Sequence, residues 1–142
     1  SHVDQLDTST EISSGAIQGD DKKPDGSVIF ATDDSGKIHS YSLGTTWDVS
    51  TGSHSKTIDI SSQGDSFVGL AFRDSGARMY VIDETNDNII EFLLGTDWDI
   101  STASHNKTVS VASGFPPPRD VAFKTDESRM YVGRNEIKEY TV

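Results

Sequence analysis

The sequence is dominated by an internal repeat. Residues 43–60 read LGTTWDVSTGSHSKTIDI, and residues 94–111, 51 positions later, read LGTDWDISTASHNKTVSV, with eleven of the eighteen residues identical. A second segment also repeats, because residues 69–92 (GLAFRDSGARMYVIDETNDNIIEF) return from Asp120 as DVAFKTDESRMYVGRNEIKEY. A repeat of this length indicates one supersecondary unit copied along the chain, so the fold is expected to be an array of such units.

Each unit of about 50 residues contains four strand-like segments and no stretch with a convincing helical period. Clusters of β-branched and aromatic residues, such as residues 79–82, alternate with turn sequences rich in Asp, Gly, Asn and Ser. We therefore predict an all-β fold, a β-propeller built from four-stranded antiparallel blades, with three blades in the chain. A stacked β-solenoid is the structural alternative, although its coils are usually shorter and more uniform.

Composition narrows the classes of partner. The 142 residues are 33% hydrophobic and carry a formal charge of −11 with no run of lysine or arginine, so neither nucleic acid nor an anionic membrane is expected as a partner. No apolar run approaches the roughly 18 residues that span a bilayer. The absence of cysteine excludes disulfides, thiolate catalysis and cysteine-bound zinc. These features do not fix the compartment, and an extracellular or virion-associated location is the one favoured.

Two motifs resemble a known group of repeats. Residues 70–81 and residues 121–132, which share an Ala-Phe pair and the run Arg-Met-Tyr-Val, are similar to propeller repeats of the YVTN and lactonase-like group. The link Leu-Gly-Thr-x-Trp-Asp-[Val/Ile]-Ser-Thr resembles a variant of these repeats in bacterial and phage proteins. The resemblance covers most of residues 24–142 and implies a propeller. It implies no single activity, since the group contains enzymes, adhesins and scaffolds.

The number of blades has a consequence, because propellers typically close with 4–8 blades. Residues 8–13 (TSTEIS) take the place that residues 57–62 hold in the next unit, and the last unit stops at its third strand. We expect a single repeat domain over residues 1–142. Its parts are an N-terminal closing strand at about residues 5–14 and blades at about residues 15–62, 63–113 and 114–142.

Two copies joined head to tail would give six blades, with the closing strand of each copy completing the third blade of the other. The partner expected for this chain is therefore itself, most simply as a homodimer. Ile12, Ile137 and Tyr140 are the residues predicted to make this assembly. The alternative is that the chain is a fragment or an engineered half of a longer propeller, and Ser1 and His2 look like an expression remnant.

Trp47 and Trp98 stand at equivalent positions of the repeat, each followed by an aspartate. A pair of exposed indoles could bind a small-molecule or glycan ligand by stacking. Because both residues recur with the repeat, we favour the alternative that each indole covers the outer end of a blade or a joint between blades. In that case Asp48 and Asp99 would cap the turn that follows.

Phe115 and Arg119 flank the proline run at residues 116–118, and they are the remaining candidates for ligand contact. This loop would lie on one face of a propeller near its axis. A polyproline segment there is equally compatible with a rigid recognition rim and with a stiff linker.

Asp83 and Asp87 belong to an acidic turn that superficially resembles a calcium loop, but the ligand spacing of an EF-hand is missing. Calcium is therefore the one cofactor that we consider, and none is required. The histidines show no metal-site spacing. His54 and His105 are predicted to be solvent-facing turn residues, and His39 to be an exposed residue of a strand.

We expect a non-enzymatic propeller module that binds or scaffolds, since the residues that look chemical recur with the blades whereas an active site is usually unique. The alternative is a lactonase-like propeller hydrolase with a metal in its central channel. Its candidate residues at the inner strand ends form no recognisable set: Asp33, Asp65, Glu84 and Asp120. A third possibility is an engineered scaffold without a native function.

Overall fold

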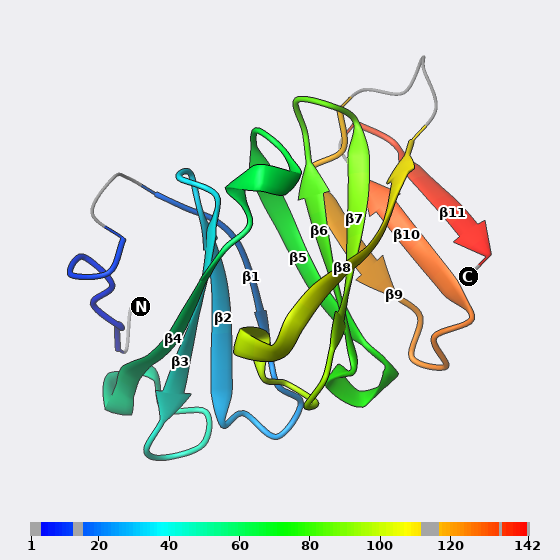
Figure 1. Ribbon diagram of the computed structural model, residues 1–142. Coiled ribbons are helices and arrows are strands. Elements are labelled where there is room, and N and C mark those ends of the chain that lie inside the picture. The colour runs from blue at the N-terminus through cyan, green and yellow to red at the C-terminus, as the bar shows by residue number, and fades with distance from the viewer. Residues whose placement is uncertain (1–3, 13–15, 112–116, 134, 142) are drawn as a thin grey trace.

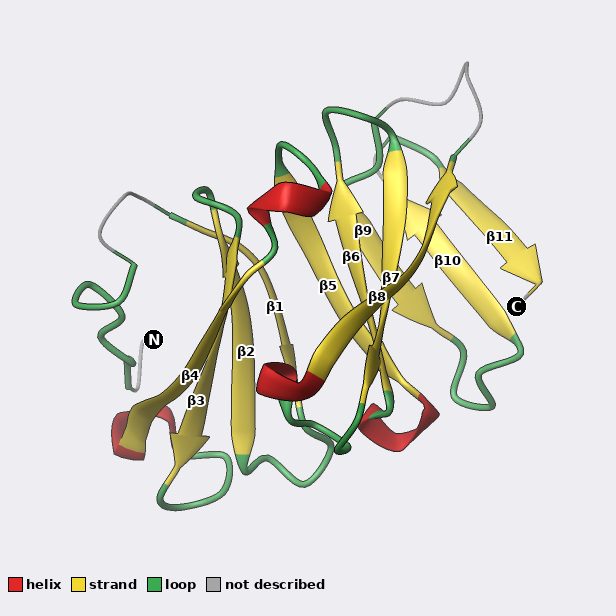
Figure 2. Cartoon of the chain, viewed as in Figure 1, coloured by secondary structure: helices red, strands yellow, loops and turns green. Residues whose placement is uncertain are grey.

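The computed structural model describes residues 4–12, 16–111, 117–133 and 135–141. These residues form three antiparallel sheets that follow one another along the chain (Figure 1). The helical segments among them are 3₁₀ turns of three residues each (Figure 2). In the described part of the chain no helix is long and apolar enough to cross a membrane. The predicted all-β fold of propeller blades is confirmed.

Each sheet is one blade of the predicted repeat. Blade 1 contains β1 (Ile17–Lys22), β2 (Val28–Asp33), β3 (Lys37–Leu43) and β4 (Gly52–Asp59). Blade 2 contains β5 (Phe67–Arg73), β6 (Arg78–Asp83), β7 (Asn88–Leu94) and β8 (Ala103–Ser110). Blade 3 has three strands, β9 (Asp120–Phe123), β10 (Arg129–Gly133) and β11 (Ile137–Thr141). The 3₁₀ turns are η1 (Val49–Thr51), η2 (Ser61–Gln63), η3 (Asp74–Gly76) and η4 (Ile100–Thr102).

The repeat in sequence is also a repeat in geometry. In every blade the strands pair with their neighbours in chain order, so that each sheet is a meander. The first strand carries a register shift between Ile17 and Gly19 in blade 1, and one between Phe67 and Gly69 in blade 2. Bulges at matching positions re-aim the same side chains in both blades, which indicates that they are part of the design of the unit.

The blades pack face to face, with their first strands side by side. Strand β1 contacts β5, and β5 contacts β9. One apolar cluster, including Phe30, Met79 and Ile100, joins blades 1 and 2, and a second, including Tyr80, Ile89 and Val132, joins blades 2 and 3. Blade 2 is thus covered on both faces, which explains the nearly continuous apolar run of β5.

The outer strands β4 and β8 are longer than predicted. The polar segment Ser-His-x-Lys-Thr was expected to be a turn, but it lies within both strands. His54 and His105 are solvent-exposed, as predicted, although they belong to strands. An edge strand of a blade faces water along much of its length, so a polar composition does not distinguish it from a turn.

Candidate functional site

Trp98 lies at the joint between blades 1 and 2. Its ring centroid is 5.1 Å from that of Phe72 in its own blade and 6.2 Å from that of Phe30 in blade 1. The indole rests on Gly76, where an added Cβ would overlap with the ring. The carboxylate of Asp99 accepts a hydrogen bond from the backbone N–H of Ser101 at 3.0 Å and caps η4. Trp98 is therefore part of the packing between blades.

Trp47 repeats this local structure without the neighbouring blade. Both tryptophans have a left-handed backbone, with φ of 67° at Trp47 and 64° at Trp98. The indole of Trp47 rests on Gly26, and Asp48 caps η1 through the backbone N–H of Ser50 at 3.1 Å. However, Trp47 is 60% exposed, because no sheet formed by the described residues packs against this side of blade 1.

The other exposed apolar residues of the terminal blades follow the same rule. Ile17 is 46% exposed, whereas its repeat equivalent Phe67 is 2% exposed against blade 1. Ile137 is 77% exposed, whereas its equivalent Ile89 is 2% exposed between blades 2 and 3. We call the side of blade 1 that faces away from blade 2 the leading face (Ile17, Ile29, Ala31, Tyr41, Trp47), although Ala31 and Tyr41 are already buried in the single chain. We call the side of blade 3 that faces away from blade 2 the trailing face (Tyr131, Ile137). Both faces carry residues that are buried wherever two blades meet.

The N-terminal segment, residues 4–12, lies beside the leading face in Figure 1. It contains no strand in this single chain, and residues 13–15 are outside the described part. Leu6 contacts Gly52, and a cavity of about 260 Å³ separates the segment from Ile29 and Tyr41. Ile12, one of the predicted assembly residues, is buried within its own chain. The closing strand at about residues 5–14 concerns pairing with a second copy and stays a prediction.

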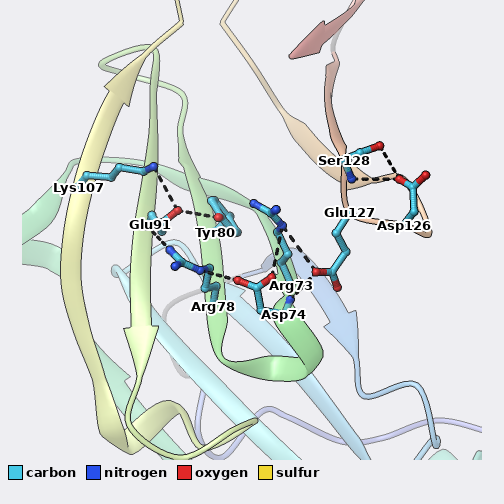
Figure 3. A network of polar contacts seen from close by, with 9 residues as sticks. All are labelled: Arg73, Asp74, Arg78, Tyr80, Glu91, Lys107, Asp126, Glu127 and Ser128. Atoms are coloured by element: carbon cyan, nitrogen blue, oxygen red, sulfur yellow. Dashed lines mark hydrogen bonds and ion pairs between the residues drawn. The ribbon is translucent and has the colours of Figure 1, made fainter. Parts of the chain in front are cut away.

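A polar cluster lies between blades 2 and 3 (Figure 3), and sequence reasoning missed it. The buried carboxylate of Glu91 accepts hydrogen bonds from the hydroxyl of Tyr80 at 2.6 Å, from Arg78 at 2.9 Å and from the side-chain amide of Asn106. The ammonium of Lys107 lies 3.5 Å from this carboxylate. The only available signal was one carboxylate within the apolar run of β7.

The charges of this cluster stabilise one another. Burial would raise the pKa of Glu91, but the hydrogen bonds from Tyr80 and Asn106 and the charges of Lys107 and Arg78 outweigh burial and lower the pKa. Burial, followed by the hydrogen bond to Glu91, raises the pKa of Tyr80 to about 12. The carboxylate is therefore ionised and the phenol neutral over the whole physiological range.

A cleft of about 490 Å³ opens beside this cluster, between blades 2 and 3. We call it the interblade cleft. Apolar side chains form one part of its lining and charged side chains the other. Its lining residues are Arg73, Asp74, Arg78, Tyr80, Ile89, Glu91, Lys107, Val109, Met130, Tyr140 and Thr141. Tyr140, predicted as an assembly residue, thus faces blade 2 of its own chain.

The predicted calcium ligands have other contacts. The carboxylate of Asp83 is buried and accepts hydrogen bonds from the side-chain amide of Asn86 at 2.7 Å and from the backbone N–H groups of Thr85 and Asp65. Asp87 has a left-handed backbone, with φ of 52°. Among the described residues, no group of three or more acidic or histidine side chains is placed to hold a metal ion. Calcium binding by Asp83 and Asp87 is untested.

Arg119 pairs with Glu84 at 2.9 Å and is exposed over about half of its side chain, at 55%. Phe115 lies outside the described residues, so Arg119 is the one of these two candidate ligand residues that the structure describes.

The prediction that His39 is exposed was wrong. His39 and Asp33 are both buried, and Nε2 of the imidazole lies 3.1 Å from Oδ2 of Asp33. Its Nδ1 lies 2.9 Å from Oγ1 of Thr57. Burial would raise the pKa of Asp33, but hydrogen bonds from the backbone of Lys37, from Ser35 and from His39 lower it. This pair fixes the turn between β2 and β3.

Comparison with known proteins supports the propeller fold. No protein-family model matches the sequence, and a comparison with curated proteins finds no match. Among solved structures, a putative 6-phosphogluconolactonase from Bacteroides uniformis superposes with a TM-score of 0.65 at 19% identity, over 97% of this chain and 40% of that one.

Two further structures show the same likeness. The periplasmic gluconolactonase PpgL of Pseudomonas aeruginosa gives a TM-score of 0.61 at 16% identity, over 86% of this chain and 34% of that one. Hydrazine synthase of Kuenenia stuttgartiensis gives a TM-score of 0.62 at 18% identity, over 88% of this chain and 32% of that one. The chain therefore spans about a third to two fifths of these proteins. At identities this low the likeness shows a shared propeller fold and carries no information about activity.

Proposed function

We propose that this chain is a non-enzymatic propeller module that assembles with a second copy of itself into a closed ring. The observation that carries the proposal is the pairing of exposed and buried repeat equivalents. Ile17 and Ile137 are exposed on the terminal blades, whereas their equivalents Phe67 and Ile89 are buried between blades. Trp47 is likewise exposed, whereas its equivalent Trp98 is partly buried in the joint. A second copy that meets the leading face with its trailing face would bury these residues by the packing already seen between blades 1 and 2.

The contacts of this joint can be stated from the repeat. Trp98 lies over Phe30 of the preceding blade, and the equivalent of Phe30 in blade 3 is Tyr131. Trp47 of one copy would accordingly lie over Tyr131 of the other, with Ile137 beside it. The N-terminal segment would leave the leading face and pair with the free edge of β11, so that the third blade also gains four strands. Closure would cover both end faces and pair the free edge of β11.

Sedimentation equilibrium tests the proposal, because the single chain has a mass of 15.4 kDa and the ring would have twice that mass. Ile137→Asp places a charge in the joint and is expected to shift the protein to the single-chain mass. Ser53→Asp is the matched control, since it adds the same charge to the exposed outer strand β4, away from both end faces. A single-chain mass for the unmodified protein at micromolar concentration would refute ring closure.

A second candidate function is hydrolysis of a sugar lactone. It is supported by the fold likeness to a putative 6-phosphogluconolactonase and to a periplasmic gluconolactonase. Its test is the hydrolysis of gluconolactone and of 6-phosphogluconolactone by the purified chain, with and without added calcium. Turnover above the uncatalysed rate would favour the enzyme over the binding module.

A further inference from the structure

The interblade cleft between blades 2 and 3 has a filled counterpart between blades 1 and 2. There, the turn η4 packs against the outer strand β4, and Ile100 is fully buried in the apolar cluster of that joint. The carboxylate of Asp99 lies 2.5 Å from the ammonium of Lys56, which also donates to the hydroxyl of Ser101 at 3.3 Å. The occupant of this position is thus an aspartate, an aliphatic residue and a serine in sequence.

Two residues of the outer strand correspond on the side of the preceding blade, whereas the deeper wall of the cleft is more polar, with Arg78 and Glu91 in place of Val28 and Ser40. Lys107 takes the place of Lys56, and Val109 takes the place of Ile58. In the described chain no segment covers them, so the side chain of Lys107 is 58% exposed and Val109 is 48% exposed. The cleft therefore presents an exposed cation beside an apolar side chain, as Lys56 and Ile58 do at the other joint, and the ammonium of Lys107 also lies 3.5 Å from the carboxylate of Glu91.

Trp98, which precedes Asp99 at the other joint, rests on a glycine, and the interblade cleft offers no such packing position for a tryptophan. The positions under Trp47 and Trp98 are Gly26 and Gly76, which have positive φ and no side chain. The equivalent residue of blade 3 is Glu127, which has the same left-handed backbone with φ of 57° but carries a side chain. Its carboxylate accepts a hydrogen bond from the backbone N–H of Asp74 at 2.9 Å, which fixes it at the edge of the cleft.

We propose that the interblade cleft is a peptide-binding site for a segment of a second polypeptide that carries aspartate, then isoleucine or valine, then serine. Lys107 pairs with the aspartate, and the aliphatic side chain packs against Ile89, Val109 and Tyr140. Glu127 excludes a tryptophan before the aspartate. The site lies away from the leading and trailing faces, but Tyr140 belongs to β11, which would gain a partner strand in the ring, so binding is measured at a concentration where sedimentation shows single chains.

An NMR titration of the ¹⁵N-labelled full chain tests the site. The probe is the capped peptide Thr-Asp-Ala-Asp-Ile-Ser-Thr-Ala, which copies residues 96–103 with alanine at the tryptophan position, at millimolar concentrations. Amide shifts are expected at Ile89, Lys107 and Val109. A peptide with lysine in place of the second aspartate is expected to bind at least about fivefold more weakly. Lys107→Glu is expected to reverse this order of the two peptides.

The tryptophan-containing peptide gives a second test. It is expected to bind more weakly than the alanine peptide to the native chain, and Glu127→Gly is expected to abolish that difference. Shifts at Lys56 and Ile58 would mean that the peptide displaces η4 at the other joint, and they would refute the site. Absence of binding at about 5 mM peptide, which corresponds to a binding free energy of about −3 kcal/mol, would refute it as well. So would absence of charge reversal with Lys107→Glu.

Discussion

Trp47 and Trp98 form a matched pair for testing how much a joint between blades stabilises the fold. Both residues have the same left-handed backbone and rest on a glycine, so replacement by alanine changes the local strain equally. They differ in that Trp98 contacts the rings of Phe30 and Phe72 while Trp47 is 60% exposed. The two alanine variants therefore differ by the loss of two ring contacts, one with Phe30 of the neighbouring blade and one with Phe72 of the same blade.

The expected difference follows from the area and the ring contacts that are lost. Removing a large aromatic residue from a core costs about 3–5 kcal/mol. Because Trp98 is only partly buried, we expect Trp98→Ala to lower the free energy of unfolding by about 2–3 kcal/mol, including two ring contacts of about 0.5–1.5 kcal/mol each. We expect Trp47→Ala to lower it by less than about 1 kcal/mol in the single chain.

Urea unfolding followed by circular dichroism measures this difference. With a slope of about 2 kcal/mol per molar urea, the midpoints of the two variants should lie about 1 M apart. The measurement is made at a protein concentration where sedimentation shows single chains. At concentrations where the ring forms, Trp47→Ala should become destabilising as well. Equal midpoints for the two variants in the single chain would refute the reasoning.

Three further predictions concern stability. Glu91→Gln should cost about 1–3 kcal/mol at neutral pH. Since the pKa of Glu91 is lowered in the fold, its contribution is present above the ordinary carboxyl pKa and lost as the pH falls through the folded value, so the difference from the native chain should shrink below about pH 4 in acid denaturation. Gly76→Ala should cost about 2–3 kcal/mol in urea, since φ is +94° and the Cβ meets Trp98, whereas Gly95→Ala, with ordinary contacts, should cost under about 0.5 kcal/mol. His39→Ile removes a hydrogen-bond partner of buried Asp33, so it should lower the free energy of unfolding by about 1–3 kcal/mol and with it the thermal midpoint. An unchanged midpoint would contradict this role of His39.

Much of the fold could be predicted from the sequence, because the repeat makes the sequence pattern of each strand and turn recur along the chain. The strand β6 and its counterpart β10 share the run Arg-Met-Tyr-Val, and a β-branched and aromatic run bounded by turns leaves little alternative to a strand. The caps were also predictable, since Asp48 and Asp99 precede serine at the spacing of an Asx turn.

The errors have a common physical cause, which is that a polar residue can be buried when a partner from another element satisfies it. His39 alternates with apolar residues in β3 and was therefore predicted to be exposed, yet Asp33 from β2 pairs with it. The carboxylate of Asp83 is buried in the same way, and the backbone N–H of Thr85 in its own turn donates a hydrogen bond to it. Such partners depend on register and on the neighbouring blade, which one sequence does not display.

The interblade cleft was invisible to sequence reasoning for a related reason. Its walls come from two blades, and it is open because no described segment occupies the position that η4 fills at the other joint. Lys107 is an ordinary member of the repeat when it is read alone. It becomes informative only when its contacts are compared with those of Lys56, which is held by Asp99.

The glycine beneath each tryptophan also decides which blades of this kind are interchangeable. Gly26 and Gly76 make room for an indole, whereas Glu127 fills that room with its own side chain. Duplicating residues 52–102 in tandem should therefore add a blade to the array, because each added copy contains both the tryptophan and the glycine beneath it. A copy of blade 3 placed between two other blades would have Glu127 where the indole needs a glycine, so no tryptophan could pack there. This one turn residue would therefore prevent further blades from being added at that point.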